Sequence, residues 1–149
     1  MHHPFSQNGF TLVELLVVIT IVGIITFLGI RAFSNTIPKS SLELDADRVV
    51  ELIHRAQART LSGDFNDVWG VYLTATNSTL FKGTTFVGRD PAFDETYGFS
   101  ETVSASGLSE IVFEIRTGET LNTGTITLTS TESGESIHLV VNTTGRVSR

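Results

Sequence analysis

Glu14 is the residue whose type and position most clearly indicate chemistry. It is the one charge in the run Phe10–Ile30, whose 21 residues include no Pro, Asn, Asp, Lys or Arg. At about 1.5 Å per residue, a helix of this length covers roughly 31 Å, the thickness of a bilayer's hydrocarbon core. A carboxylate in such a helix is costly unless a cation pairs with it. The sequence therefore indicates charge pairing at Glu14, the alternative being a signal anchor whose one Glu reaches the membrane interface.

The residues that lead to Glu14 carry a recognisable pattern, Gly9-Phe10-Thr11-Leu12-Val13-Glu14. This pattern resembles the processing and methylation motif of type IV pilins and of the related pseudopilins of type II secretion. The resemblance implies that a prepilin peptidase cuts after Gly9 and methylates the new amino terminus, Phe10. It also implies that Glu14 neutralises the Phe10 amine of a neighbouring subunit during filament assembly.

The same resemblance implies a function and a set of partners. The chain would be a structural subunit, a pilin or minor pseudopilin, of a type IV pilus or a type II secretion-like filament, and not an enzyme. Its partners would be other pilin or pseudopilin subunits, the prepilin peptidase, the inner membrane and, indirectly, the assembly platform and motor ATPase. The precursor would be a single-pass protein of the inner membrane with its later part in the periplasm or outside the cell. The assembled filament would be extracellular.

The residues on either side of the apolar run give opposite indications of orientation. Residues 1–9 form a short polar leader without Lys or Arg, and Asn8 stands where the family usually has a basic residue. Arg31 and Lys39 follow the run, and by the positive-inside rule they favour a cytoplasmic C-terminal side. We follow the cleavage motif instead, because it requires the leader on the cytoplasmic side.

Other residue types give weaker indications of chemistry. The absence of Cys excludes disulfides and thiolate metal sites, and His54 and His138 lack the spacing of metal ligands. Asp90, Asp94 and Glu95 gather in an expected loop, which is either solvated or a calcium site. The solvated loop is favoured because the EF-hand pattern is absent. We expect no cofactor, no metal and no catalytic residues, so a membrane-anchored enzyme is a distant alternative.

Two arginines close the chain, Arg146 and Arg149. Together with the segment Trp69-Gly70-Val71, the ending Gly145-Arg146-Val147 resembles minor pseudopilins of the GspH/FimT type, some of which bind DNA for uptake. That resemblance implies an alternative function, a DNA-binding minor pilin with Arg146 and Arg149 on phosphates. The charge opposes it, because five basic residues face eleven acidic ones beyond Ser62. A solubilising role for the two arginines is therefore favoured.

The elements that must position these residues predict an α+β fold. We expect a long N-terminal spine helix, its first half spanning the membrane, packed on a C-terminal antiparallel β-sheet as in pilins. The expected divisions are a leader (1–9), a transmembrane or filament-core helix (10–30), its amphipathic continuation (31–62) and a β-rich head (63–149).

The continuation has its own expected details. Pro38 predicts a kink or short break, and the helical period resumes at Ser41 and ends near Leu61, with Ser62-Gly63 as the stop. The expected buried stripe comprises Leu42, Ala46, Val49, Val50, Ile53, Ala56 and either Thr60 or Leu61.

Alternation and turn residues predict the strands of the head. They are expected at 68–74, 79–82, 84–87, 102–105, 110–116, 125–131 and 136–141, with a loop over 88–99 and a hairpin turn over 132–135.

Overall fold

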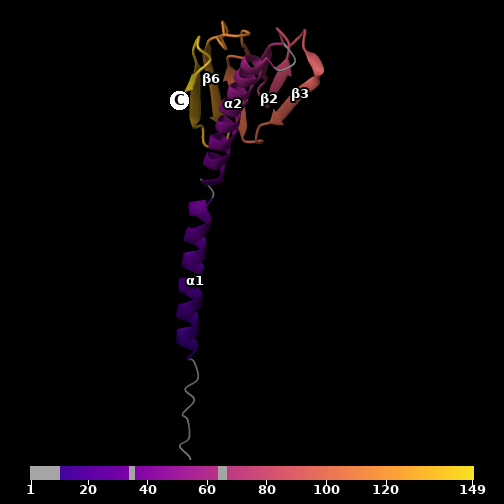
Figure 1. Ribbon diagram of the computed structural model, residues 1–149. Coiled ribbons are helices and arrows are strands. Elements are labelled where there is room, and N and C mark those ends of the chain that lie inside the picture. Colours follow the sequence, from indigo (N-terminus) through magenta and orange to yellow (C-terminus); the bar gives the residue numbers. More distant parts are fainter. Residues whose placement is uncertain (1–10, 34–35, 64–66) are drawn as a thin grey trace, which may run out of the picture. The chain divides into compact units, whose positions relative to one another are not determined.

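The computed structural model describes residues 11–33, 36–63 and 67–149, and for 27–33 and 36–40 it describes the backbone alone. The chain forms two compact units, Met1–Thr36 and the globular unit Ile37–Arg149. Figure 1 follows both units along the sequence, from the indigo first helix to the yellow C-terminal strands. Within the described ranges the elements are two helices followed by eight strands.

The first helix, α1 (Leu12–Phe33), is apolar on every side. The large apolar side chains from Leu12 to Ile25 are all exposed, from 48% at Val17 to 79% at Leu12. A helix that is apolar all round is normally found buried. The exposed apolar surface of α1 therefore favours burial in a membrane or against another protein surface. Among the described residues, no helix reaches the length and apolarity needed to cross a membrane.

The second helix, α2 (Thr36–Ser62), begins earlier than the sequence predicts. Pro38 lies in its first turn rather than in a break before Ser41, because the first-turn amides of a helix need no intrahelical partner. The helix ends at Ser62, and Gly63 follows in the left-handed conformation with φ at +69°, as expected of a C-terminal stop.

The predicted stripe on α2 is confirmed by burial. Val50 is half-buried, and of the last two candidates Thr60 is buried while Leu61 is 50% exposed. The other stripe residues are fully or almost fully buried: Leu42, Ala46, Val49, Ile53 and Ala56. Two further buried residues, Asp45 and Leu52, were not predicted.

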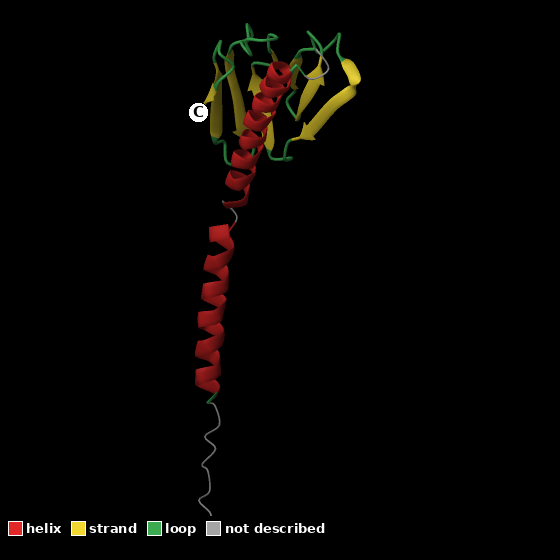
Figure 2. Cartoon of the chain, viewed as in Figure 1, coloured by secondary structure: helices red, strands yellow, loops and turns green. Residues whose placement is uncertain are grey.

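The strands form two antiparallel sheets rather than the single sheet that the sequence predicts (Figure 2). The first sheet has the order β3-β2-β1-β5 and consists of β1 (Trp69–Leu73), β2 (Asn77–Lys82), β3 (Asp90–Gly98) and β5 (Glu110–Val112). The second has the order β4-β6-β7-β8 and consists of β4 (Val103–Gly107), β6 (Gly124–Ser130), β7 (Ser136–Val141) and β8 (Val147–Ser148). The α+β class is confirmed, since helices and antiparallel sheets make up the described chain.

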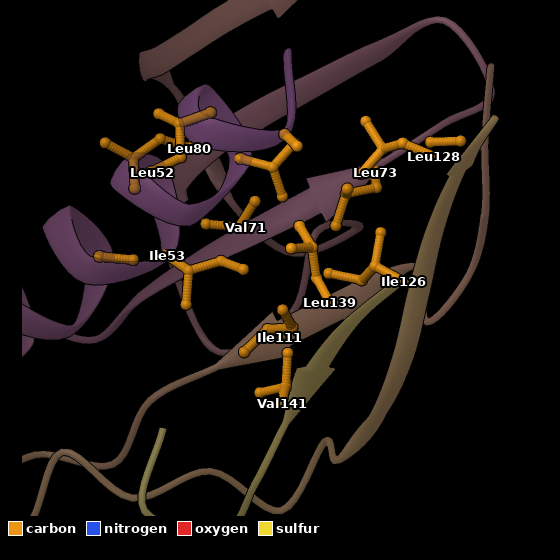
Figure 3. Packing of buried hydrophobic residues seen from close by; sticks show 14 of the residues in the cluster. Leu52, Ile53, Val71, Leu73, Leu80, Ile111, Ile126, Leu128, Leu139 and Val141 are labelled. Atoms are coloured by element: carbon orange, nitrogen blue, oxygen red, sulfur yellow. The ribbon is translucent and has the colours of Figure 1, made fainter. Parts of the chain in front are cut away.

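One apolar core joins α2 to both sheets (Figure 3). Leu52 and Ile53 enter it from the helix, Val71 from the first sheet, and Ile126 and Leu139 from the second. Inward and outward side chains alternate along β6 and β7, so each strand presents one apolar face to this core. The two sheets therefore act as one support for the helix.

Three expectations about the strands differ from the structure. Residues 88–99 contain β3, an edge strand, where a loop was expected, and residues 84–87 form bends and a turn where a strand was expected. An edge strand tolerates Pro91 and exposed polar side chains because one row of its backbone groups needs no partner in the sheet. The sequence 110–116 also yields only the short β5, ending at Val112.

Candidate assembly site in the first helix

Glu14 lies in the first turn of α1, where the helix start is capped. The helix begins at Leu12, and Thr11 precedes it as the N-cap residue, because its carbonyl oxygen accepts a hydrogen bond from the Leu15 amide at 3.2 Å. The Thr11 hydroxyl oxygen accepts from the Glu14 amide at 3.3 Å. Glu14 is thus the third helical residue, where a negative side chain also suits the positive end of the helix dipole.

The other polar side chains described in α1, those of Thr20 and Thr26, are satisfied within the helix. Thr20 donates its hydroxyl hydrogen to the Leu16 carbonyl and Thr26 donates to the Val22 carbonyl, both at 2.8 Å. The Glu14 carboxylate is exposed and makes no hydrogen bond or ion pair with any described residue. The stretch of α1 whose side chains are described, up to Thr26, can therefore be buried at little polar cost except at Glu14, which requires a cation.

Gly9 and Phe10, the predicted cleavage and methylation residues, lie outside the described residues. Residues 4–30 match the family described as the prokaryotic N-terminal methylation motif. The chain carries this methylation motif. The match is consistent with type IV pilins and pseudopilins, which are structural proteins rather than enzymes. It supports a precursor that is processed by prepilin peptidase, anchored in the membrane and assembled with other pilin subunits.

The motif covers only the beginning of the chain, and no solved structure was found to match the chain. The GspH/FimT resemblance rests on residues 69–71 and 145–147, which lie outside the matched segment. It therefore stays a prediction.

The two terminal arginines differ in whether their side chains have partners. Arg149 donates to the Asp47 carboxylate of α2 at 2.5 Å, so its charge is compensated. Arg146 is exposed, and its guanidinium contacts no hydrogen-bonding or charged partner in the described chain. Its backbone is held in the turn before β8, where the Arg146 amide donates to Asn142 Oδ1 at 2.9 Å.

Arg116 is a second arginine without a partner among the described residues, and sequence reasoning missed it. It is exposed and adopts φ of +77°, the one positive φ of a described residue other than glycine. Its loop is joined to the loop before β8, because the Gln57 side chain donates to both the Gly118 and Thr144 carbonyls, at 2.7 and 2.9 Å. Among the side chains that the structure describes, the arginines without a partner are therefore Arg116 and Arg146, not Arg146 and Arg149.

The three acidic residues of the expected loop, for which a solvated loop was favoured over a calcium site, lie along β3 and have separate roles. Asp94 accepts from Arg89 Nε at 2.8 Å, and Glu95 accepts from Arg55 at 3.0 Å and Arg59 at 2.6 Å. Asp90 Oδ1 accepts from the Ala92 amide at 3.1 Å. In the described ranges, no three His, Cys, Asp or Glu side chains are grouped as metal ligands would be. Of the three carboxylates, Glu95 attaches the edge strand to α2, whereas the bonds of Asp90 and Asp94 lie within residues 89–94.

Arg55 is the centre of that attachment between α2 and β3. It donates to Tyr97 and Glu51 in addition to Glu95. The hydrogen bond to Tyr97 and the one to Glu51 raise the pKa of the Arg55 guanidinium above its ordinary value. The two histidines take no part in it, since His54 is exposed and His138 pairs across the second sheet with the Thr127 hydroxyl at 3.1 Å.

Proposed function

We propose that the protein is a structural subunit, a pilin or minor pseudopilin, of a type IV pilus or a type II secretion-like filament. In this proposal prepilin peptidase cuts after Gly9 and methylates Phe10. The helix α1 then leaves the membrane for the filament core, where Glu14 of one subunit pairs with the Phe10 amine of a neighbour. The globular unit is displayed on the outside of the filament.

The observation that carries the proposal is Glu14, which has no partner among the described residues and lies on the apolar surface of α1. The large apolar side chains around it are all exposed, and the two hydroxyl groups further along are bonded to the helix itself. Burial of this surface against like helices is favourable, at roughly 25 cal/mol per Å² of apolar area. A carboxylate buried without a partner would oppose this burial. A cation from another subunit would remove that cost by pairing with Glu14.

Membrane insertion before assembly is part of the same proposal. The apolar run Phe10–Ile30 would hold the precursor as a single-pass protein of the inner membrane, and it extends beyond the described residues at Phe10. The assembly platform and the motor ATPase would then act on the inserted subunit. These partners are supported by the motif and by the apolar run.

A competition experiment tests the Glu14 contact. Full-length Glu14→Gln and wild-type subunits, distinguished by tags, would be expressed together and their ratio measured in sheared filaments and in membranes. We expect an equal ratio in the membrane and at least about tenfold depletion of the variant in filaments, because the Phe10 ammonium loses its counter-charge. Glu101→Gln, an exposed residue of the globular unit, is the control. Equal incorporation of Glu14→Gln would contradict the proposal.

A second candidate is a DNA-binding minor pilin, and one observation favours it. The loops that carry Arg116 and Arg146 are joined through Gln57, and neither guanidinium has a partner among the described residues. Two exposed cations at one end of the globular unit suit phosphate groups. The acidic charge of the surrounding surface keeps this candidate second.

A further inference from the structure

The outer edge of β3 holds two residues whose backbone groups are unpaired. The Phe99 amide donates to the Thr76 carbonyl at 2.8 Å, and hydrogen-bonded pairs alternate along an antiparallel ladder. Tyr97 therefore also faces β2, whereas the N–H and C=O groups of Thr96 and Gly98 point away from the sheet. Among the described residues these four groups have no hydrogen-bonding partner.

The edge of the second sheet has a similar unpaired stretch, because β8 pairs only with the last two residues of β7. Ser136 and His138 precede those two residues and have no neighbouring strand on that side. The Ser130 amide donates to the Glu135 carbonyl at 2.8 Å, so the same alternation turns the N–H and C=O groups of Ser136 and His138 away from β6. Within the described chain these groups also lack a partner.

The two edges lie on opposite sides of the globular unit and run in opposite directions along α2 (Figure 1). β3 runs from the level of Arg59, which pairs with Glu95, toward Asp45, whose carboxylate binds the second residue after the strand. β7 begins beside Leu42 and leads to a turn that the Gln57 side chain binds. Two copies placed side by side with their α2 helices in the same direction therefore present antiparallel edges.

The side chains at the two edges are complementary in shape and compatible in charge. Tyr97 is 37% exposed and points to the α2 side of its sheet, where its hydroxyl oxygen accepts from an α2 arginine. Ile137 points to the α2 side of the other sheet and lines a groove of about 330 Å³ with Leu42 and two glutamates. Residues 96–98 and 136–138 include no Asp, Glu, Lys or Arg, although the chain has a net charge of −6. Contact at these edges limits the repulsion between acidic copies.

We propose that β3 of one subunit pairs antiparallel with β7 of the next, so that their globular units join edge to edge. This inference rests on the proposed function. Thr96 exchanges two hydrogen bonds with the neighbouring copy's His138, and Gly98 exchanges two with its Ser136. Tyr97 then lies opposite Ile137 of that copy and fills the groove beside it. Because the contact joins two different edges, it can repeat from copy to copy without closing, as a filament requires.

Disulfide formation tests this contact in assembled filaments, because the chain has no Cys of its own. In the full-length variant Thr96→Cys with His138→Cys, the two thiols lie at opposite edges of one unit, so only neighbouring copies can join. Facing Cα atoms of a hydrogen-bonded pair lie about 5.5 Å apart, a separation that a disulfide spans. After mild oxidation of sheared filaments, non-reducing electrophoresis should show a ladder of dimers, trimers and larger species. Thr96→Cys with Thr125→Cys, whose second thiol lies exposed on the central strand β6, should give no ladder.

A change in the backbone tests the hydrogen bonds independently. Gly98→Pro removes the outward N–H group, whereas Gly98→Ala keeps it, and a Cβ at this position meets nothing within 4 Å. Each variant would compete with tagged wild-type subunits, and the ratio would be measured in membranes and in filaments. We expect equal ratios in membranes, about fivefold depletion of Gly98→Pro in filaments and less than about twofold depletion of Gly98→Ala, as the loss of one hydrogen bond predicts.

The outcomes separate this contact from the proposed function. Filaments that contain Thr96→Cys with His138→Cys but give no ladder would overturn the inference, as would wild-type incorporation of Gly98→Pro. A ladder from the Thr125→Cys pair would also overturn it, because the cross-links would then not depend on the β7 edge. If the first cysteine pair does not assemble, the Gly98 comparison decides. All of these results leave the Glu14 contact standing, whereas wild-type incorporation of Glu14→Gln would overturn the proposed function and this inference with it.

Discussion

Gly70 of β1 and Phe81 of β2 lie directly opposite each other, and the Phe81 ring covers the glycine. A Cβ on Gly70 would stand 2.6 Å from ring Cζ and 2.6 Å from the Ile111 carbonyl oxygen. Phe81 is fully buried, so the ring has little room to move. We expect Gly70→Ala to lower the free energy of unfolding of the globular unit by about 1–3 kcal/mol, measured by urea denaturation.

Gly98 provides a matched control for this substitution. It also lies in a strand, β3, but a Cβ there would meet nothing within 4 Å. Gly98→Ala should therefore change the stability little. Equal stabilities of the two alanine variants would contradict the close packing of Phe81 on Gly70.

Asp45 is a buried carboxylate on the core-facing side of α2. Its Oδ2 atom accepts a hydrogen bond from the Ser100 amide at 2.8 Å. Asp45→Ala removes that acceptor, and we expect a loss of about 1–3 kcal/mol in the free energy of unfolding because the Ser100 amide loses its partner. Asp45→Asn keeps an acceptor oxygen and should lose less, as thermal or urea unfolding can show.

The neighbouring Asp47 tests whether burial causes that loss. It lies on the exposed side of α2 and pairs with Arg149. Since exposed ion pairs contribute little, Asp47→Ala should cost less than about 1 kcal/mol. If Asp47→Ala lowered the free energy of unfolding more than Asp45→Ala, burial would not explain the effect of Asp45.

Processing can be examined directly at Gly9 and Phe10. Mass spectrometry of the protein from cells with an active prepilin peptidase should show Phe10 as the first residue, carrying one added methyl group. Gly9→Val should leave the leader attached, because branching at Cβ restricts the backbone next to the bond to be cut. Gly23→Ala, a change in α1 with nothing within 4 Å of the new Cβ, should be processed normally. An intact Met1 in the wild-type protein would rule out the cleavage assignment.

Periodicity predicted those parts of the globular unit in which one face is buried and the other is not. The apolar residues of α2 recur at helical spacing, and their burial follows that spacing. In β7, the recurrence of Ile137, Leu139 and Val141 at every second position predicted the observed bounds Ser136–Val141. Asp45 lies on the same helix face as Leu42 and Val49, so its spacing could have predicted its burial. It was missed because carboxylates are rarely buried.

The features that periodicity did not predict depend on contacts between residues far apart in sequence. The edge strand β3 carries Pro91 and polar residues, and Glu95 attaches it to Arg55 and Arg59, which lie 40 and 36 residues earlier. The pair of Arg149 and Asp47 is separated by 102 residues. No local pattern shows that such groups will meet. By contrast, the prediction of charge pairing at Glu14 came from a local pattern, the six adjacent residues Gly9–Glu14.

DNA binding can be tested on the globular unit, which has its own core. Arg116 and Arg146 are its unpaired arginines among the described residues, and neutralising two phosphates gives a slope of about −1.8 in a plot of log affinity against log salt. Because five basic residues face eleven acidic ones beyond Ser62, we expect only millimolar affinity for duplex DNA at physiological salt. Fluorescence anisotropy over a salt series measures both quantities.

Asp47 offers a way to strengthen that binding by design. Asp47→Ala removes the carboxylate that holds Arg149, and a third available cation should steepen the salt slope to about −2.7. Arg149→Ala should leave the wild-type slope unchanged, since its charge is already compensated, whereas Arg146→Ala should reduce the slope to about −0.9. Low-micromolar binding by the wild-type unit that Arg146→Ala abolishes would contradict the expected weak affinity. It would make DNA binding, rather than filament structure alone, the leading function of the exposed unit.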